Sequence, residues 1–563
     1  MKYSELCETY KALEETTKGL EKTEILARFL DKLKLEKSWE VVYLLKGLVF
    51  ADYDERELGI SHQLSIKAIS SAVGVSSEEV VSRFKELGDL GKVAEELVGV
   101  KKQVTLSSSD LDVERVLKDL RKLPGLEGKG TVDKKLGLII GLLNASKPVE
   151  ARYIVRSVLG DLKIGVGDGI LRDAIVESCF SPKDVEEKKE KVLKVQGAYD
   201  KSSDFAEIFE KACSGKLNEI KLSADKPIKV MLFPKAADVE DAFRIVGRPA
   251  AFEFKYDGFR VMINKNEEGE IKIFTRRLDN VTNQFPDVVE YVKENVKGKS
   301  FILDGEVVGF NPETEKAEPF QAISQRIRRK YDIERLVKKL PVEILVFDVV
   351  YYEGESFIET SFKERRELIE KIVKTQKLKI GLAEQIVSDD EKVAEEFYKK
   401  SLDEGQEGLM VKGLNKPYKP GARIGYAVKL KPEDNDFDLV ITGAEWGTGK
   451  RAGWLTSFDV SCLDEKTGEL KEIGKVSTGL KEKEEEGVSF MQLTKELQKN
   501  IEREDGRHVY VKPKIVVTVQ FQNVQQSPTY SSGYALRFPR IKALRPDRTK
   551  NDIATLDEVG KGI

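Results

Sequence analysis

The sequence is poor in the residues that build disulfide frameworks, zinc sites and histidine-based active sites. Its 563 residues include only 4 cysteines and 2 histidines, His62 and His508. The cysteines lie far apart and form no CxxC pair: Cys7, Cys179, Cys213 and Cys462. We therefore expect reduced, buried thiols in an intracellular protein. A histidine triad or a multi-histidine metal site is excluded, so any catalysis must rest on lysine, arginine and carboxylates.

Long apolar runs are also missing. The longest run, LGLIIGLL at residues 136–143, is far shorter than the roughly 20 residues that span a bilayer. The acidic, amphipathic start, MKYSELCETYKALEETTKGL, has no signal-peptide core. We expect a soluble, cytoplasmic protein with no membrane partner. A net charge of only −3 also means that any polyanionic partner must be held by local basic patches.

The length suggests about three domains, and the hydrophobic periodicity changes along the chain. Residues 1–225 are predicted to form an all-α domain, because apolar residues recur at spacings of three and four. Residues 226–430 change to a period of two and are predicted to form an α+β domain. Its expected strands are 229–233, 251–255, 260–265, 271–276, 300–310, 343–352, 408–412 and 426–431. Residues 431–563 contain about five further strand patterns and are predicted to form an all-β barrel of the OB type.

One of these strands ends in a way that raises a question about Lys255. The segment AFEFKYDGFRVMINK, residues 251–265, alternates, is interrupted at Lys-x-Asp-Gly and then alternates again. An ordinary hairpin with a solvated lysine is one interpretation, and a lysine nucleophile is the other. Further charged or aromatic residues follow on predicted strands: Arg276, Glu306, Phe347, Glu407, Lys412, Lys429 and Lys431. Their number favours a shared site over isolated edge residues.

Two glycine-rich segments imitate phosphate-binding motifs but lack essential residues. GAEWGTGKR has Ala444 in place of the first P-loop glycine and Arg451 in place of Ser or Thr. GVGDGI at residues 165–170 lacks the final glycine of a dinucleotide fingerprint and follows a helical segment. Neither segment predicts a nucleotide site.

The order of the charged motifs resembles that of the covalent nucleotidyltransferases, which comprise ATP-dependent DNA ligases, RNA ligases and mRNA capping enzymes. The matching segments are KYDGFR, TRR, LDGEVV, LVFDVVY, EGLMVK and AVKLK, followed by ALRFPRIKALRPDR. The last segment is similar to the form carried by ATP-dependent DNA ligases of the archaeal and eukaryotic replicative type. The resemblance extends over the whole chain and implies a helical DNA-binding domain, an adenylation domain and an OB-fold domain.

The resemblance implies that Lys255 attacks the α-phosphorus of ATP, which is consumed as co-substrate, and becomes lysyl-AMP. Cations beside such a lysine favour its free amine, and the candidates are Lys429, Lys431 and Arg260. The implied contacts to ATP come from Glu253 at the base edge, Phe347 stacked on adenine, and the phosphate and ribose ligands Arg276, Arg423, Lys429 and Lys431. Glu306 and Glu407 would serve the ribose and hold Mg²⁺. Two arginines of the barrel domain would reach the β- and γ-phosphates: Arg537 and Arg540.

A helical segment indicates the nucleic-acid partner. KPVEARYIVRSVLGDLKIGVGDGILRDAI, residues 147–175, resembles the DNA-binding domain of replicative-type ligases. The residues of this segment that are expected to contact nicked double-stranded DNA are Arg152, Arg156, Gly165, Gly167, Gly169 and Arg172. On charge alone, a solvated helix pair is the simpler interpretation. Two basic stretches, 324–341 and 537–550, would add phosphate contacts that are independent of sequence.

The implied function is ATP-dependent DNA ligation in DNA replication, repair and recombination. Alternatives are an RNA ligase, an mRNA-capping-type enzyme and a non-catalytic DNA-binding scaffold. An NAD-dependent ligase is disfavoured because the four spaced cysteines of its zinc site are missing. We expect a monomer. A sliding clamp would require a non-standard motif, because KKQVTLSSSDLDV has Gln103 and Leu106 but no aromatic pair.

Overall fold

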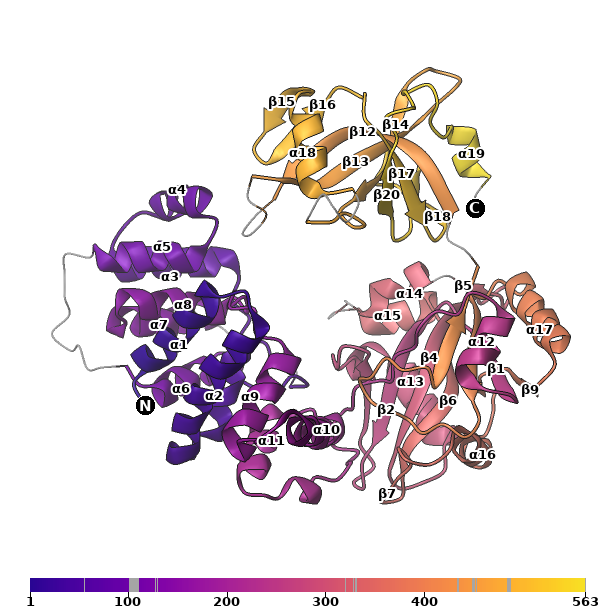
Figure 1. Ribbon diagram of the computed structural model, residues 1–563, viewed down its shortest axis with the longest axis horizontal. Coiled ribbons are helices and arrows are strands. Elements are labelled where there is room, and N and C mark those ends of the chain that lie inside the picture. Colours follow the sequence, from indigo (N-terminus) through magenta and orange to yellow (C-terminus); the bar gives the residue numbers. More distant parts are fainter. Residues whose placement is uncertain are drawn as a thin grey trace. The chain divides into compact units, whose positions relative to one another are not determined.

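The computed structural model describes the chain except for residues 55, 101–110, 127, 129, 319, 328, 330, 331, 433, 434, 448–450, 452, 483–487, 562 and 563. The chain divides into two compact units, Met1–Lys431 and Pro432–Ile563 (Figure 1). The predicted clamp-motif residues Gln103 and Leu106 lie outside the described residues. Within the described part, no helix combines the length and apolarity needed to cross a membrane. The domain boundaries at residues 225 and 430 stay predictions.

The N-terminal part of the chain is helical, as predicted, and is drawn from indigo to magenta in Figure 1. Its elements are α1 (Tyr3–Glu15), α2 (Gly19–Glu36), η1 (Trp39–Lys46), α3 (His62–Val73), α4 (Ser77–Leu87), α5 (Leu90–Gly99), α6 (Val113–Lys122), α7 (Thr131–Ala145), α8 (Pro148–Val158), α9 (Asp168–Phe180), α10 (Val185–Ser202), α11 (Phe205–Cys213) and η2 (Leu217–Glu219). Apolar residues at spacings of three and four form the buried faces, as with Leu6, Tyr10 and Leu13 in α1. Ser76 caps α4 by accepting a hydrogen bond from the Glu79 amide.

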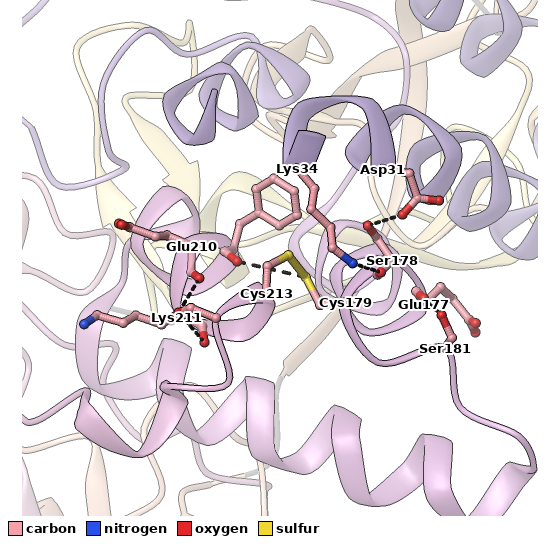
Figure 2. Close-up of a disulfide and its surroundings, with 11 residues drawn as sticks. Asp31, Lys34, Glu177, Ser178, Cys179, Ser181, Glu210, Lys211 and Cys213 are labelled. Carbon is pink, nitrogen blue, oxygen red and sulfur yellow. Dashed lines mark hydrogen bonds between the residues drawn. A yellow bond between two sulfur atoms is a disulfide. The ribbon is translucent and has the colours of Figure 1, made fainter. Parts of the chain in front are cut away.

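One prediction about this region is wrong, because two of the four cysteines form a disulfide. Figure 2 shows Cys179, near the end of α9, bonded to Cys213, the last residue of α11. Their Cα atoms are 4.8 Å apart, although the residues are separated by 34 positions in the chain. Packing of α9 against α11 brings them together. Cys7 and Cys462 are buried free thiols, as expected.

Removal of the disulfide is expected to lower the stability of the protein. The bond closes a loop across 34 positions and restricts the unfolded chain, which favours the folded state by about 4 kcal/mol in the chain-entropy relation. Cys213→Ser should therefore lower the midpoint of thermal unfolding by several degrees in calorimetry. As a control, the double variant Cys179→Ser/Cys213→Ser should not respond to reductant. A wild-type midpoint that reductant leaves unchanged would contradict this expectation.

The middle part of the chain forms the predicted α+β domain. Its elements are α12 (Val239–Val246), β1 (Ala250–Lys255), β2 (Phe259–Lys265), β3 (Ile271–Thr275), η3 (Thr282–Gln284), α13 (Pro286–Asn295), β4 (Phe301–Phe310), β5 (Ala317–Glu318), α14 (Phe320–Ile327), α15 (Ile333–Lys339), β6 (Val342–Tyr352), β7 (Glu355–Ser356), α16 (Phe362–Ile372), β8 (Ile380–Leu382), β9 (Gln385–Ser388), α17 (Glu391–Asp403), β10 (Gly408–Gly413) and β11 (Ala427–Leu430). One sheet has the strand order β11-β10-β1-β9, and the other has the order β3-β2-β4-β6-β7, with β5 paired to β4 and β8 to β6. Helices α12 and α17 pack on the first sheet around Phe243, Phe252 and Phe397, while α13 and α16 pack on the second. The domain therefore has two sheets with separate cores.

The strand predicted at residues 229–233 is wrong. Pro227 and Pro234 flank this segment, and proline cannot donate a hydrogen bond to a neighbouring strand. Among the described residues the segment takes part only in an isolated bridge between Leu232 and Arg423. The other seven predicted strands are present as β1, β2, β3, β4, β6, β10 and β11.

The C-terminal unit consists mainly of strands, as predicted. Its elements are β12 (Asn435–Trp446), β13 (Leu455–Leu463), β14 (Leu470–Val476), α18 (Phe490–Gln498), β15 (Ile501–Asp505), β16 (His508–Val511), β17 (Val516–Phe521), β18 (Val524–Gln526), β19 (Tyr534–Leu536), β20 (Arg540–Leu544) and α19 (Leu556–Gly560). The long strand β12 pairs with β13 on one edge and with β16 and β17 on the other. Phe458, Val460 and Val519 belong to the core of this unit. The five predicted strand patterns correspond to β12, β13, β14, β16 and β17. Strands β15, β18, β19 and β20 have no predicted counterpart; β15, IERED, is largely exposed and lacks apolar alternation, and β18 and β19 have only three residues each.

Candidate active site

Lys255 lies where the chain passes from one sheet to the other, so the hairpin interpretation is wrong. Strand β1 ends at Lys255 and pairs with β10 and β9, whereas β2 begins at Phe259 and pairs with β3 and β4. Residues Tyr256–Gly258 therefore form a crossover between the two sheets. Glycine is needed at position 258, because a Cβ atom on Gly258 would lie 2.4 Å from the Val307 carbonyl oxygen.

Strand register aligns several predicted residues on the first sheet. Glu253 in β1 lies opposite Gln385 in β9 and opposite Met410 in β10. Met410 in turn lies opposite Lys429 in β11. Lys255 is two residues beyond Glu253, and alternation along a strand places both side chains on the same face. One face of this sheet therefore carries a carboxylate, the candidate nucleophile and a second lysine.

The amine of Lys255 contacts a carboxylate. Its Nζ atom lies 2.5 Å from Oε2 of Glu407, and the two side chains are only 23% and 16% exposed. The backbone amide of Glu407 also donates to the Lys255 carbonyl at 2.9 Å. The side chain of Lys255 is therefore held within the site and does not extend into solvent.

Glu306 contributes a carboxylate from the second sheet. It lies in β4 opposite Arg260 of β2. Burial raises the pKa of Glu306 to about 8. The positive charges of Lys255 and Arg260 oppose this rise, and the negative charges of Asp304 and Glu407 add to it. Glu306 therefore interacts with residues from both sheets.

Arg260 is fixed by a buried carboxylate. Its Nε atom donates to Oδ1 of Asp304 at 2.8 Å, and its Nη1 atom donates to the Met231 carbonyl at 2.7 Å. Asp304 is fully buried and also accepts a hydrogen bond from the Tyr418 hydroxyl at 2.8 Å. Burial lowers the pKa of Arg260, but the charge of Asp304 outweighs this effect and raises the pKa overall. The guanidinium therefore stays charged. It lies 5.4 Å from the centre of the ring of Phe347, the residue predicted to stack on adenine.

Lys429 lies among other cations. Burial lowers the pKa of Lys429, and neighbouring positive charges lower it further. These charges belong to Lys255, Arg423, Arg276 and Lys431. Arg276 also lines a pocket of about 440 Å³, whose other charged lining residues are Asp52, Lys229 and Arg277. This concentration of positive charge suits a polyphosphate.

The two arginines predicted to contact DNA from α8 lie among carboxylates. Arg156 is 2% exposed, and ion pairs of 2.9 Å join it to Glu14 and to Asp89. The side chain of Arg152 is 19% exposed and pairs with Glu95. Both guanidinium groups therefore connect α8 to neighbouring helices, and Arg156 does not reach the surface in this structure.

The glycine-rich turn leads into α9. Gly165 has a φ of +64°, and its carbonyl accepts a hydrogen bond from Lys22 at 3.3 Å. Gly167 is the residue before the helix and Gly169 lies in its first turn, where free amide groups favour anions. Arg172 donates to Oε1 of a glutamine on α10 at 2.9 Å. Phosphate contacts from this turn stay a prediction.

Arg537 and Arg540 lie in the C-terminal unit, where Arg537 directly follows β19 and Arg540 is the first residue of β20. Arg537 is 8% exposed, and its amide donates to the Asn523 carbonyl at 2.9 Å. Arg540 is exposed and lies opposite Gln520 in the sheet. Contacts between these arginines and the β- and γ-phosphates stay a prediction.

Several residues of the site have no counterpart in the sequence analysis. Asp304 lies two residues before Glu306 in the segment LDGEVV, and strand alternation was the signal that could have identified it. Tyr418 and Gln385 carry no local signal. Their partners, Asp304 and Glu253, lie 114 and 132 residues away in the chain.

The site and fold together define a class of protein. A lysine at the crossover of two sheets, flanked by carboxylates and cations, lies in the middle domain of a chain with a helical domain before it and a β-rich domain after it. This is the arrangement expected of a covalent nucleotidyltransferase that acts on a nucleic acid. Comparison with known proteins narrows the class.

Three family descriptions match the chain: DNA ligase N terminus at residues 2–176, ATP dependent DNA ligase domain at 230–431, and ATP dependent DNA ligase C terminal region at 451–548. The DNA ligase of Nanoarchaeum equitans (strain Kin4-M) is 45% identical over 566 residues, which cover 99% of this chain and 98% of the relative. The DNA ligase of Thermococcus fumicolans is 41% identical over 564 residues, which cover 100% and 98%. The solved structure described as Pmar-Lig_PreS3 shares the fold, with a TM-score of 0.53 and 18% identity over 96% of this chain and 99% of that chain. The chain belongs to the ATP-dependent DNA ligase family.

Proposed function

We propose that this protein is an ATP-dependent DNA ligase that seals nicks in duplex DNA, with Lys255 as its nucleophile. The observation that carries the proposal is the position of Lys255 at the crossover between two sheets. There it contacts Glu407 and interacts through charge with Glu306 and Lys429. A solvent-exposed lysine at an ordinary turn would not require these neighbouring carboxylates and cations.

In the first step, Nζ of Lys255 would attack the α-phosphorus of ATP. A nitrogen–phosphorus bond forms, the bond to the pyrophosphate oxygen breaks, and the amine loses a proton. Contact with Oε2 of Glu407 would orient the amine, and its proton would pass to solvent. Lys429 and Arg276 would balance the charge that grows on the phosphate oxygens.

The proposal includes Mg²⁺, and the donor set of the site fits this ion. The negative charge of Glu407 helps to raise the pKa of Glu306, so the two carboxylates lie within electrostatic range of each other. Mg²⁺ prefers oxygen ligands and is commonly held by one or two carboxylates together with substrate phosphates. The described residues contain no group of three or more potential metal ligands, so substrate phosphates would complete the set. When bound, the ion would neutralise phosphate charge.

The remaining contacts to ATP would come from both units. Phe347 would stack on adenine, and Glu253 would accept a hydrogen bond at the base edge. Arg260 and Arg423 would lie near the ribose and phosphates. Two residues of the C-terminal unit would contact the β- and γ-phosphates during this step: Arg537 and Arg540.

The later steps would use DNA. AMP passes from Lys255 to the 5′-phosphate at a nick, and the 3′-hydroxyl then displaces it, which joins the strands and releases AMP. Backbone phosphates would contact Arg152, Arg172 and the turn residues Gly165, Gly167 and Gly169. Arg156 would act indirectly, because it is buried and holds α8 in place.

Nick sealing and formation of the protein–AMP adduct should differ in their dependence on salt concentration. Phosphate contacts release counterions, so sealing at limiting DNA is expected to fall by about 10³-fold between 50 and 200 mM salt if about six contacts form. Formation of the protein–AMP adduct should change little, since it needs no DNA. Rates of both steps with labelled ATP and nicked DNA test this prediction, and equal salt sensitivity would contradict it. The same assay with GTP or nicked RNA tests the RNA ligase and capping alternatives.

The cellular location, oligomeric state and protein partner of the enzyme are also proposals. We infer a cytoplasmic monomer that acts on the chromosome in replication, repair and recombination. Light scattering of the purified protein measures the oligomeric state. Binding to a sliding clamp would use a non-standard motif, and a pull-down with an immobilised clamp tests it.

A further inference from the structure

The carboxylate of Glu253 is buried and has three neighbouring groups that fix its orientation. Glu253 is 2% exposed and has three cationic or amide partners. Nζ of Lys412 lies 2.6 Å from Oε2, and Nε2 of Gln385 donates to Oε1 at 2.8 Å. Nη1 of Arg366 lies 3.6 Å from the same Oε1 atom. Both oxygens of the carboxylate are therefore oriented by donors from three different elements.

Two of these partners are themselves fixed by their surroundings. Lys412 is 4% exposed, with its Nζ atom 4.6 Å from the ring centre of Phe347 and 4.4 Å from that of Phe362. Arg366 donates to the Ala383 carbonyl at 3.1 Å through Nη1. Lys412 therefore connects the Glu253 carboxylate to the ring that is predicted to stack on the base.

Gln385 differs from these two partners because it is uncharged and is placed by sheet register. It begins β9 and lies directly opposite Glu253 in β1. The side-chain amide of Gln385 orients the carboxylate without adding charge, because its N–H group donates along one lone-pair direction of Oε1. Oε1 accepts a hydrogen bond from Gln385 and Oε2 forms the ion pair with Lys412, so each oxygen has a further lone-pair direction for a ligand. Loss of Gln385 would leave Oε1 with only the longer contact to Arg366.

The orientation of the Glu253 carboxylate bears on which base the site binds. An ionised carboxylate only accepts hydrogen bonds. Adenine presents an amine at position 6, which donates, whereas guanine presents a carbonyl oxygen there, which the carboxylate repels. Sites that hydrogen-bond a substrate group reject analogues that lack it far more strongly than apolar pockets do. Discrimination therefore depends on keeping Glu253 aimed at that position.

We propose that Gln385 is the positioning residue that makes this site selective for adenine over guanine nucleotides, by orienting the carboxylate of Glu253. The inference rests on the proposed function and specifies how that site chooses its nucleotide. Gln385 acts through Glu253 and takes no part in phosphoryl transfer.

The test replaces Gln385 in the full-length protein and compares two nucleotides. Gln385→Met removes the donor and keeps the length of the side chain. Adduct formation on Lys255 is measured with labelled ATP and with labelled GTP, in each case as kcat and KM. For ATP, kcat/KM should fall about tenfold, mainly through KM, as expected for a hydrogen bond to a charged group. For GTP it should not fall, so the ratio between the nucleotides should decrease about tenfold.

Matched variants distinguish positioning from simple damage to the fold. Val387→Ala changes the same strand at a side chain that is 53% exposed and lies opposite Ala251, so the nucleotide ratio should stay at the wild-type value. Gln385→Glu places a second carboxylate against Glu253 and should weaken the use of ATP further. Equal losses with ATP and GTP in Gln385→Met, or an unchanged ratio, would overturn the assignment. A wild-type protein that forms no adduct with either nucleotide would overturn the proposed function itself, and this assignment with it.

Discussion

Lys255→Ala is expected to abolish the covalent protein–AMP adduct and all ligation that depends on ATP. The amine is the atom that bonds to phosphorus, and an alanine offers no replacement nucleophile. The rate of adduct formation should fall by at least about 10⁴-fold, as with the loss of other enzyme nucleophiles. Incubation with labelled ATP and Mg²⁺, followed by denaturing electrophoresis, measures the adduct, which should be labile to acid and stable to alkali.

A second lysine provides the control for this experiment. Lys272 lies in β3 and pairs with Glu270 at 3.2 Å, away from the residues of the site. Lys272→Ala removes the same number of atoms and the same charge, and it should be labelled like the wild-type protein. Label retained by Lys255→Ala would show that another residue is the nucleophile.

Glu306→Gln is expected to reduce adduct formation by about 10² to 10³-fold, the loss typical of a group that stabilises charge in a transition state. The amide has nearly the same shape, but it cannot ionise and so cannot help to hold a divalent cation between the sheets. The concentration of Mg²⁺ needed for half-maximal rate should increase. Single-turnover adenylation over a range of Mg²⁺ concentrations measures both effects. Glu355→Gln, an exposed change in β7, is the control, and a wild-type Mg²⁺ response in Glu306→Gln would exclude the metal role.

The same variant should change how stability depends on pH in protein free of metal and nucleotide. Burial raises the pKa of Glu306 from its ordinary value of 4.5 to about 8. Between these values the folded protein keeps a proton that the unfolded chain releases, so the contribution to stability is present below about pH 4.5 and is lost as the pH rises through 8. Wild-type protein should therefore lose stability relative to Glu306→Gln between pH 5 and pH 9 by roughly the linkage expected for one group. Unfolding midpoints in EDTA at each pH measure the difference, and a constant difference would contradict the assignment.

Most of the residues that the sequence analysis expected in one site lie on strands, although Glu407 lies just before β10. Strand alternation places Glu253 and Lys255 on the same face, whereas the pairing of Glu306 with Glu407 was implied by the resemblance to the nucleotidyltransferases. The order of motifs then indicated which strands meet. The structure brings Lys255, Glu306, Glu407 and Lys429 within range of one another, although their roles in catalysis stay predictions.

Residues whose partners are distant in the chain could not be placed in this way. Arg156 has the spacing of a DNA contact, but its partner Glu14 lies 142 residues away and its environment is buried. The disulfide between Cys179 and Cys213 depends on the packing of two helices, which the spacing of the cysteines does not reveal. Sequence periodicity describes one element at a time, whereas these features depend on pairs of elements.

The short crossover at residues Tyr256–Gly258 has a mechanical consequence for the enzyme. Four residue steps join the last Cα of β1 to the first Cα of β2, which limits their separation to about 14 Å even in a fully stretched chain. A second short connection, from Leu382 at the end of β8 to Gln385 at the start of β9, also joins the two sheets. The two tethers limit separation of the sheets beside Lys255 and beside Gln385, which lies opposite Glu253. The candidate nucleophile is therefore anchored to both sheets, and parts of the sheets farther from these connections have more freedom to move.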